Sequence, residues 1–528
     1  MLKPDMNFAK SVLESAERIV LGTINTLQSC NYDQEQVVTY DLAHIAAEVE
    51  AAKSVLAYGT TGESEGNLAC AFIADVLANL VGKAFGNEQY WAIEVADMER
   101  FRNFNNIYGS PGFLAQLADT KDSSPLDPDF EMVRDVFRRF ATEKIAPVAD
   151  DIHRYNLDIP EEVIAGLGEM GAFGLSIPEE YGGFASGTGN DYLAMIIATE
   201  ELSKASLGAG GSLITRPEIL ARALIKGGTP EQKNYWLPRL ASAEIIPAVA
   251  VTEPDFGSDV ASLTTSATKN ESGWIINGVK TWCTFAARAN VLMLLARTDP
   301  DRSLAHRGLS MFIVPKPQGE AKGFLFTQDP RPDGTIGKME GRPIDTIGYR
   351  GMHSYEIAFE NWWVSDDHLV GMEDGLGKGF YFQMEGFENG RIQTAARAIG
   401  VMEAAYGAAL EYARNRKVFG EPIFNYQLTQ AKLGKMAAII TASRQFSYHV
   451  ATLMSKGEGS MQASMSKAFA CRAAEWVTRE AMQIHGGMGY AEEFSVSRYF
   501  VDARVLSIFE GADETLSLKV IAKKLITK

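Results

Sequence analysis

The hydrophobic pattern changes character twice along the chain, and this feature constrains the fold most strongly. Up to about residue 245 apolar residues recur at helical spacing, as at Val12 and Ala16. Residues 245–364 contain short runs rich in β-branched and aromatic residues, and helical spacing returns from about Asp366. Helices, then strands, then helices predict an α+β fold with segregated layers, because alternating βαβ units would interleave the two patterns.

Breaks in this pattern divide the chain into four predicted domains. A chain of 528 residues is too long for a single core. The segment 118–129 is polar and contains proline, which makes it the best candidate for a linker. We therefore expect a helical N-terminal extension, a helical N-domain, a β domain and a C-terminal four-helix domain, which span residues 1–120, 126–245, 246–365 and 366–528.

Two local patterns carry further expectations. Asn277-Gly278 lies between apolar runs, which predicts a type I′ hairpin turn. The helix pair that begins near Tyr40 resembles the pair that begins near Tyr426. The N-terminal segment is either a degenerate copy of part of the C-terminal domain or an Ala-rich helix pair that is similar only in composition, and the sequence favours neither interpretation.

Composition excludes several classes of function. The net charge of −17 repels phosphate backbones, so nucleic acid is not expected as a partner. We find no window of about 18 apolar residues and no signal-peptide pattern, so we expect no membrane span. The cysteines are scattered without metal-ligand spacing, which argues against a metal site or disulfides and favours a reducing cytoplasm; they are Cys30, Cys70, Cys283 and Cys471.

Several motifs occur in the order and spacing of one enzyme family. Three of them resemble signatures of the acyl-CoA dehydrogenases: AVAVTEPDFGSDV (248–260), RKVFGEPIFNYQ (416–427), and QIHGGMGY (483–490) followed by IFEGADE (508–514). PEEYGG, EELSKAS and GGTPEQKNYWLP resemble further family segments. The resemblance covers about residues 126–528, and it implies an FAD enzyme that removes two hydrogens across the α,β bond of a CoA thioester.

That reaction explains why a carboxylate is needed. A thioester α-proton is weakly acidic, so its removal requires a base and stabilisation of the enolate-like oxygen. No side chain accepts the β-hydride, so a cofactor must, and the resemblance supplies FAD. Glu510 matches the family's catalytic glutamate, and a tight backbone at Gly511 is expected to let the Glu510 amide reach the thioester oxygen. One family subset takes its base from an earlier helix, but this chain has Gly390 there, and nearby Glu388 is out of register.

The resemblance also implies residues that bind cofactor and substrate. Those matched to the flavin and CoA are Thr252, Gly257, Ser258, Trp282 and Thr284, the last two beside the isoalloxazine ring. Those matched to the FAD of a neighbouring subunit or its diphosphate–adenosine path are Arg416, Phe419, Gln427, Gln483, Gly486 and Gly487. Arg391 either lies near CoA or forms a salt bridge on a helix surface.

Arg216 suggests the acyl group. It lies in GAGGSLITRPEIL (208–220), an interval that lines the far end of the acyl chamber in the family. A buried, unpaired guanidinium is costly, and a substrate carboxylate would offset that cost, with Thr215 and Ser212 able to add hydrogen bonds. The alternative is that Arg216 points to solvent or pairs with Glu218.

The helical extension, FENGR (387–391) and IFEGADE together most resemble the family members that oxidise (2S)-methylsuccinyl-CoA to mesaconyl-CoA in the ethylmalonyl-CoA pathway. Rival expectations are a general short- or branched-chain acyl-CoA dehydrogenase, an acyl-CoA oxidase that passes electrons to oxygen, and a non-catalytic flavin-binding scaffold. The resemblance further implies electron-transfer flavoprotein as acceptor and a homodimer or dimer of dimers.

The chain departs from the family in three places. Ala512 stands where a Thr or Ser is usual, and the segment 316–348 is longer than the family norm and is predicted to be a surface loop. The first 120 residues are additional. Since they lack a Glu-Gly signature, we expect them to pack on the helical body and not to hold a second active site.

Overall fold

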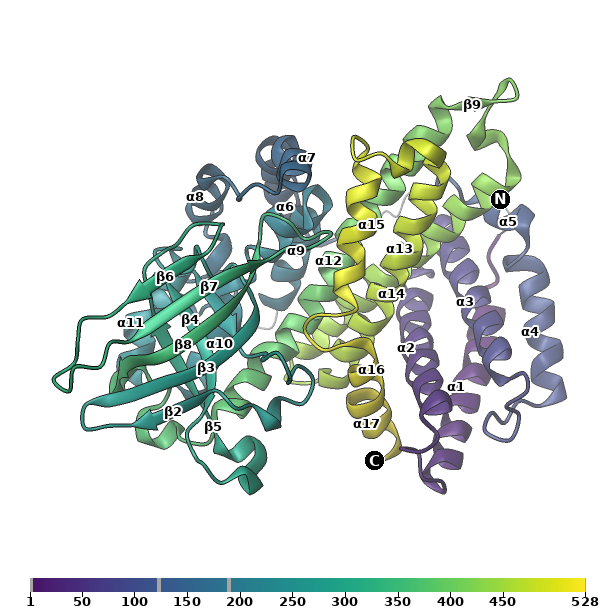
Figure 1. The fold of residues 1–528 in the computed structure, drawn as a ribbon. Coiled ribbons are helices and arrows are strands. Elements are labelled where there is room, and N and C mark those ends of the chain that lie inside the picture. The colour runs from purple at the N-terminus through teal and green to yellow at the C-terminus, as the bar shows by residue number, and fades with distance from the viewer. Residues whose placement is uncertain (1–2, 121–124, 188–190, 528) are drawn as a thin grey trace. The chain divides into compact units, whose positions relative to one another are not determined.

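Figure 1 shows the computed structural model, which describes residues 3–120, 125–187 and 191–527. By its internal contacts the chain forms two compact units. The bundle unit comprises Met1–Arg139, Glu200–Ala205 and Arg391–Lys528, and the sheet unit comprises Phe140–Thr199 and Ser206–Gly390. The predicted α+β class and the helical N-terminal extension are confirmed, while the four domain boundaries stay a prediction.

The extension consists of helices, drawn in purple and blue in Figure 1: α1 (Met6–Gln28), α2 (Gln36–Tyr58), α3 (Glu63–Ala84), α4 (Val95–Tyr108) and α5 (Pro111–Gln116). Asp5 caps the N-terminus of α1, because its side chain accepts a hydrogen bond from the Phe8 amide at 2.9 Å. The helical spacing read from Val12 and Ala16 gives a fully buried stripe on α1.

The remaining helices of the bundle unit pack against this extension. They are the later part of α12 (Gly379–Asn415), α13 (Gln427–Met454), α14 (Ser460–His485), α15 (Ser495–Leu506), α16 (Asp513–Thr515), η11 (Leu516–Ala522) and α17 (Lys523–Ile526). The helix α2 contacts α13, α14 and η11. Phe72 packs edge-on against Phe469 with ring centroids 5.4 Å apart, and Lys435 pairs with Asp75. The extension therefore packs on the C-terminal helices, as its sequence predicts.

One helix of the extension, α3, differs from the expectation that no segment is apolar enough to span a membrane. Among the described residues α3 is long and apolar enough to cross a membrane by length and composition alone. Within the bundle unit 67% of that window is buried. Its apolar character is accounted for by neighbours on several sides, since α3 contacts α2, α4 and α13.

The sheet unit is built on an eight-stranded mixed sheet. Its strands are β1 (Pro247–Ala250), β2 (Ser266–Lys269), β3 (Gly273–Thr284), β4 (Val291–Arg297), β5 (Leu309–Pro315), β6 (Phe324–Thr327), β7 (Lys338–Ile344) and β8 (Ser354–Ser365). The order is β1-β4-β2-β3-β8-β7-β6, with β5 paired to β4. The strand β4 is buried along its whole length because it lies inside the sheet and both faces are covered.

The sheet unit also contains the helices α7 (Ala146–Tyr155), α8 (Glu161–Glu169), α10 (Arg216–Gly227) and α11 (Pro230–Ala241). The helices α6 (Pro128–Phe140) and α9 (Asp191–Ala205) each have residues in both units. Leu220, Leu224 and Trp236 from α10 and α11 share a core with Met293 and Met311 from the strands. A capping box joins Thr229 and Gln232 and begins α11 at the predicted GGTPEQ break.

Two local predictions in this unit are wrong. Asn277-Gly278 is not a hairpin turn, because β3 continues through it with a bulge opposite β8. Gly278 has φ +143°, and a Cβ there would lie 2.7 Å from the Thr265 backbone, so the bulge requires glycine as a turn would. The segment 316–348 is not simply a surface loop, since it contains β6 and β7, which extend the sheet beyond β8.

Candidate active site

Glu510 lies at the tip of a short loop between α15 and α16. The Asp513 amide donates to the Ser507 carbonyl at 3.1 Å and closes this loop. Glu510 has φ +53° and Gly511 has φ +98°, so two consecutive residues adopt the left-handed region. For Glu510 this conformation costs on the order of 1 kcal/mol or more and persists only where the surroundings enforce it, as is common at functional sites. Gly511 carries no such cost.

Two side chains from α12 hold the Glu510 carboxylate. The Thr394 hydroxyl donates to Oε2 at 2.8 Å, and both Nη atoms of Arg397 donate to Oε1 at 3.1 Å. The side chain of Arg397 is 1% exposed and that of Glu510 is 9% exposed. The pair is therefore shielded from solvent, where an ion pair is stronger than at the surface. These contacts hold the carboxylate in one orientation.

The backbone on either side of Glu510 is held from α14. The Lys467 ammonium donates to the carbonyls of Phe509 at 2.8 Å and Gly511 at 2.5 Å. Burial lowers the pKa of Lys467, but the two carbonyl oxygens favour its charged form. One cation thus bridges the residues before and after Glu510, which accounts for much of the restraint that the left-handed backbone requires.

Sequence reasoning missed Thr394, Arg397 and Lys467. The first two lie on α12 at spacings of four and seven residues after Gly390, which places them on one helix face. A hydroxyl and a cation on the same face of an otherwise alanine-rich helix were a usable signal. Lys467 lies in a sequence stretch typical of a solvated helix, and its contact with the loop spans more than forty residues.

The other residues predicted in the bundle unit lie in two groups. Arg416, Phe419 and Gln427 are exposed at the small β9–β10 arm (Lys417–Val418 and Glu421–Pro422), and Phe419 is 95% exposed. Gln483, Gly486 and Gly487 are exposed at the end of α14, and a Cβ on either glycine would meet no atom within 4 Å. Arg391 is buried and donates to Ser464 at 3.2 Å, so it does not form a surface salt bridge.

The residues predicted in the sheet unit lie on β3 and the loop after β1. Trp282 has φ +57° and a 55% exposed indole, at an irregularity between Lys280 and Cys283 where β3 pairs with β8. Thr284 is hydrogen-bonded to Ser354 at 3.1 Å. Gly257 and Ser258 are exposed, and Thr252 is half-buried.

These features fit an FAD cofactor. An indole held outward by the backbone provides a stacking surface for an aromatic ring. Gly486 and Gly487 leave open space into which a diphosphate could approach the backbone. The exposed Arg416 can form a charge-assisted bond to an anionic oxygen. Among the described residues no cluster of His, Cys, Asp or Glu could hold a metal ion.

Arg216 is buried in the sheet unit, with 6% exposure. Within the described part of the chain the one hydrogen bond of its side chain joins Nε to the Ser212 carbonyl at 3.2 Å. Thr215 donates to the same carbonyl at 2.9 Å, and the buried Ser212 hydroxyl has no partner among the described residues. Glu218 pairs with Arg222 at 3.5 Å. The alternative in which Arg216 points to solvent is therefore wrong.

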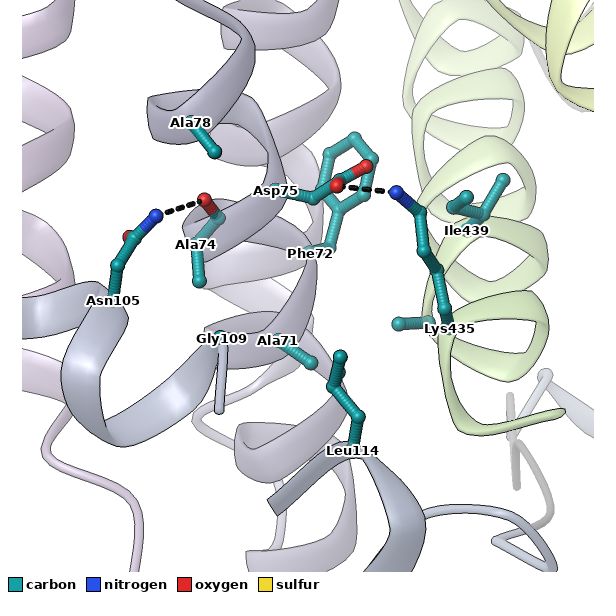
Figure 2. Close-up of a pocket in the computed structure, with 11 residues that line it drawn as sticks. Ala71, Phe72, Ala74, Asp75, Ala78, Asn105, Gly109, Leu114, Lys435 and Ile439 are labelled. Carbon is teal, nitrogen blue, oxygen red and sulfur yellow. Dashed lines mark hydrogen bonds and ion pairs between the residues drawn. The ribbon is translucent and has the colours of Figure 1, made fainter. Parts of the chain in front are cut away.

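One cavity of about 130 Å³ lies in the bundle unit. Figure 2 shows that α3, the α4–α5 region and α13 line it, with the Asp75–Lys435 ion pair at one side. None of the predicted site residues lines this cavity.

Three segments of the chain match known family domains. Residues 127–244 match the acyl-CoA dehydrogenase N-terminal domain, residues 248–362 the middle domain and residues 377–526 the C-terminal domain. The chain belongs to the acyl-CoA dehydrogenase family. Acyl-CoA dehydrogenases are FAD-dependent oxidoreductases, so the predicted enzyme class and cofactor are confirmed.

Individual relatives differ in how much of the chain they cover. (2S)-Methylsuccinyl-CoA dehydrogenase of Cereibacter sphaeroides is 38% identical and aligns with 99% of this chain and 96% of its own length. Butyryl-CoA dehydrogenase of Megasphaera elsdenii is 29% identical with a TM-score of 0.68 over 77% of this chain and 100% of that one. A chain from the structure of the electron transferring flavoprotein of Acidaminococcus fermentans is 31% identical, with a TM-score of 0.68 over 77% and 100%.

Proposed function

We propose that this acyl-CoA dehydrogenase oxidises a short branched dicarboxylic acyl-CoA, (2S)-methylsuccinyl-CoA, to mesaconyl-CoA. The buried guanidinium of Arg216 carries the proposal, because its only hydrogen bond in the described chain is to a backbone carbonyl. A substrate carboxylate would supply the missing anionic partner. The relative whose alignment includes the N-terminal extension is a methylsuccinyl-CoA dehydrogenase, which agrees with this substrate.

Glu510 acts as the α-proton base. Thr394 and Arg397 orient its carboxylate before substrate arrives. Substrate binding expels water, and a less solvated carboxylate is a stronger base. The Glu510 amide, presented by the left-handed backbone that Gly511 permits, is the hydrogen-bond donor for the thioester oxygen.

FAD, when bound, would supply the acceptor for the hydride that leaves the β-carbon. Trp282 and Thr284 would border the flavin ring, Thr252, Gly257 and Ser258 would contact the flavin and CoA, and Arg391 would lie on the CoA side. The exposed residues Arg416, Phe419 and Gln427 would hold the FAD of a neighbouring subunit, and Gln483, Gly486 and Gly487 would line the same cofactor path.

The proposal extends to the oligomeric state, the electron acceptor and the cellular location of the enzyme. An exposed arm that completes a neighbour's site requires a homodimer or a dimer of dimers. The electrons pass to electron-transfer flavoprotein, in agreement with the similarity to a chain solved in a structure of that protein. We place the enzyme in the cytoplasm, because its cysteines include three buried thiols and no paired spacing.

The substitution Arg216→Met tests the proposed substrate. Methionine is similar in length but uncharged, so activity towards methylsuccinyl-CoA should fall by roughly 10²-fold, while activity towards butyryl-CoA holds or rises. Arg222→Met is the matched control, since Arg222 lies on the same helix but already pairs with Glu218. Equal losses for both substrates, or no loss for either, would remove Arg216 from the acyl site.

Comparison of electron acceptors separates the rival activities. With ferricenium as acceptor the enzyme should turn over methylsuccinyl-CoA, and with oxygen alone it should be slow. Rapid turnover on oxygen would identify an acyl-CoA oxidase. A preference for butyryl-CoA or isobutyryl-CoA would identify a general short- or branched-chain dehydrogenase.

A further inference from the structure

The N-terminal extension reaches the loop that carries Glu510. On α2, Tyr40 and His44 lie four residues apart and therefore face the same way. The Tyr40 hydroxyl donates to Asp513 Oδ2 at 2.5 Å, and His44 Nε2 lies 3.2 Å from the same oxygen. The two contacts join residues more than 460 positions apart in sequence.

The contact between Tyr40, His44 and Asp513 is largely buried. His44 is 4% exposed, Asp513 is 9% exposed, and the Ser517 hydroxyl lies 3.1 Å from His44 Nε2. Burial alone would raise the pKa of Asp513, but the hydrogen bonds from His44 and Tyr40 outweigh it and lower the pKa. Asp513 is therefore a carboxylate that accepts hydrogen bonds from the extension. Because the contact is buried, the loss of one donor would destabilise the folded state.

Asp513 is also the anchor of the catalytic loop. Its amide donates to the Ser507 carbonyl and closes the loop, and Glu510 lies at the tip with its left-handed backbone. Lys467 holds the inside of the turn through the carbonyls of Phe509 and Gly511. A shift of Asp513 would move the closing point of the loop and with it the Glu510 carboxylate and amide.

We propose that Tyr40 and His44 are positioning residues for the reaction, through which the N-terminal extension fixes the loop that carries the catalytic base. The inference rests on the proposed role of Glu510. It assigns the extension a part in catalysis that packing alone does not require. A displacement of about 1 Å in a catalytic group can cost on the order of 10²-fold in rate.

The substitution Tyr40→Phe tests the inference with little change of shape. It removes one donor to Asp513 and should lower the rate of anaerobic flavin reduction by roughly 10-fold, while FAD content and substrate KM stay near wild type. The kinetic isotope effect with α-deuterated substrate should rise, because proton abstraction becomes more limiting. His44→Gln keeps a donor near the Nε2 position and should lose less than His44→Leu.

Tyr90→Phe is the matched control. Tyr90 is another residue of the extension whose hydroxyl donates to a carboxylate, Glu35, at 2.8 Å, but it does not contact the catalytic loop. It should change the thermal midpoint as much as Tyr40→Phe does and leave flavin reduction unaltered.

Glu510→Gln, measured in parallel, separates two kinds of failure. If Glu510→Gln abolishes flavin reduction but Tyr40→Phe leaves its rate unaltered, or if Tyr90→Phe slows it equally, the positioning role is overturned and the base assignment stands. If Glu510→Gln reduces flavin at near the wild-type rate, both the proposed base and the positioning role are overturned.

Discussion

A carboxylate that removes a weakly acidic proton must be ionised, oriented and close to that proton before the reaction begins. Thr394 and Arg397 meet the second of these requirements at Glu510, because they hold its carboxylate in one orientation, and both contacts are shielded from solvent. The left-handed backbone at Glu510 and Gly511 presents the amide as well as the side chain. In the proposed mechanism a single residue would thus supply two groups that the chemistry needs.

The substitution Glu510→Gln should keep bound FAD and substrate affinity but lower turnover by roughly 10⁴-fold or more, because the amide cannot accept the α-proton. Steady-state assays with ferricenium and the flavin absorbance spectrum measure the two effects. Glu514→Gln, an exposed neighbour on α16, is the control. Near-normal turnover of Glu510→Gln would show that another residue is the base.

The site residues could be read from the sequence only where a motif carried them. IFEG predicted Glu510 as the base, and the GAGGSLITRPEIL interval predicted Arg216 in the acyl site; both stay predictions. Thr394 and Arg397 lie in an alanine-rich helix without a matched motif, and their role depends on which face meets the loop. Tyr40 and His44 could not be found at all, because their partner is distant in sequence and only the fold brings it near.

At the scale of elements, β3 carries Trp282 above a buried ion pair. The Lys280 ammonium donates to Glu253 at 2.9 Å and to the Val251 carbonyl at 2.8 Å, and Glu253 also accepts hydrogen bonds from Thr264 and Thr265. Both charged groups are buried, so breaking the pair leaves an unpaired charge that costs about 3 kcal/mol or more. The pair ties the loop after β1 to the strand that carries the exposed Trp282 indole.

This pair predicts a specific dependence of stability on pH. Burial alone would raise the pKa of Glu253, but Lys280 and the threonine hydrogen bonds outweigh it and lower the pKa to about 2. Because the folded pKa lies below the ordinary value of 4.5, the stabilisation is complete above pH 4.5 and is lost as pH falls towards 2. Burial lowers the pKa of Lys280 to about 8, so its ionisation opposes folding below that pH and this penalty fades as pH rises from 8 towards 10.5.

Urea unfolding measured at pH 6 and pH 3 should show that Glu253→Gln is less stable than wild type at pH 6 and loses less stability on acidification. Glu340→Gln, which breaks the exposed pair with Arg342 on β7, is the control and should change little at either pH. An unchanged free energy of unfolding for Glu253→Gln at pH 6 would contradict this account of the pair.

The β-strands of the sheet unit could be predicted from the sequence only in part. The strand-rich run between residues 245 and 364 was predicted because its residue types are typical of β-structure. The hairpin at Asn277-Gly278 was wrong because a bulge inside a long strand needs the same positive φ as a turn. The strands β6 and β7, at the end of the sheet where β6 is the edge strand, were missed because glycine, proline and charge, which are typical of loops, also occur in and near edge strands.

At the scale of the whole molecule, the N-terminal extension is a structural part of the bundle unit. Its α2–α3 pair lies against the α13–α14 pair, through the Phe72–Phe469 contact and the Asp75–Lys435 ion pair among others. The solved relatives described above cover only 77% of this chain, whereas the methylsuccinyl-CoA dehydrogenase relative covers 99%. The N-terminal extension is therefore included in the alignment with the relative that is named for the proposed substrate, and the two solved relatives leave nearly a quarter of this chain uncovered.

Removal of residues 1–120 should expose the apolar faces of α13 and α14 and lower solubility or change the oligomeric mass. Light scattering and the thermal midpoint measure these effects. Removal of residues 1–3 alone, which precede the α1 cap at Asp5, is the control and should change neither. A truncated protein with unchanged mass, thermal midpoint and kinetics would contradict a structural role for the extension.

We propose that this chain, an acyl-CoA dehydrogenase, acts on a short branched dicarboxylic acyl-CoA. The most direct measurement is the anaerobic loss of oxidised-flavin absorbance when the holoenzyme is mixed with single acyl-CoA thioesters, which observes the chemical step without any electron acceptor. We expect (2S)-methylsuccinyl-CoA to reduce the flavin rapidly, and butyryl-CoA and isobutyryl-CoA to reduce it at least roughly 10²-fold more slowly, the scale of a lost charge-assisted contact. Equal or faster reduction by the monocarboxylic thioesters, or flavin that stays oxidised with methylsuccinyl-CoA, would contradict the claim.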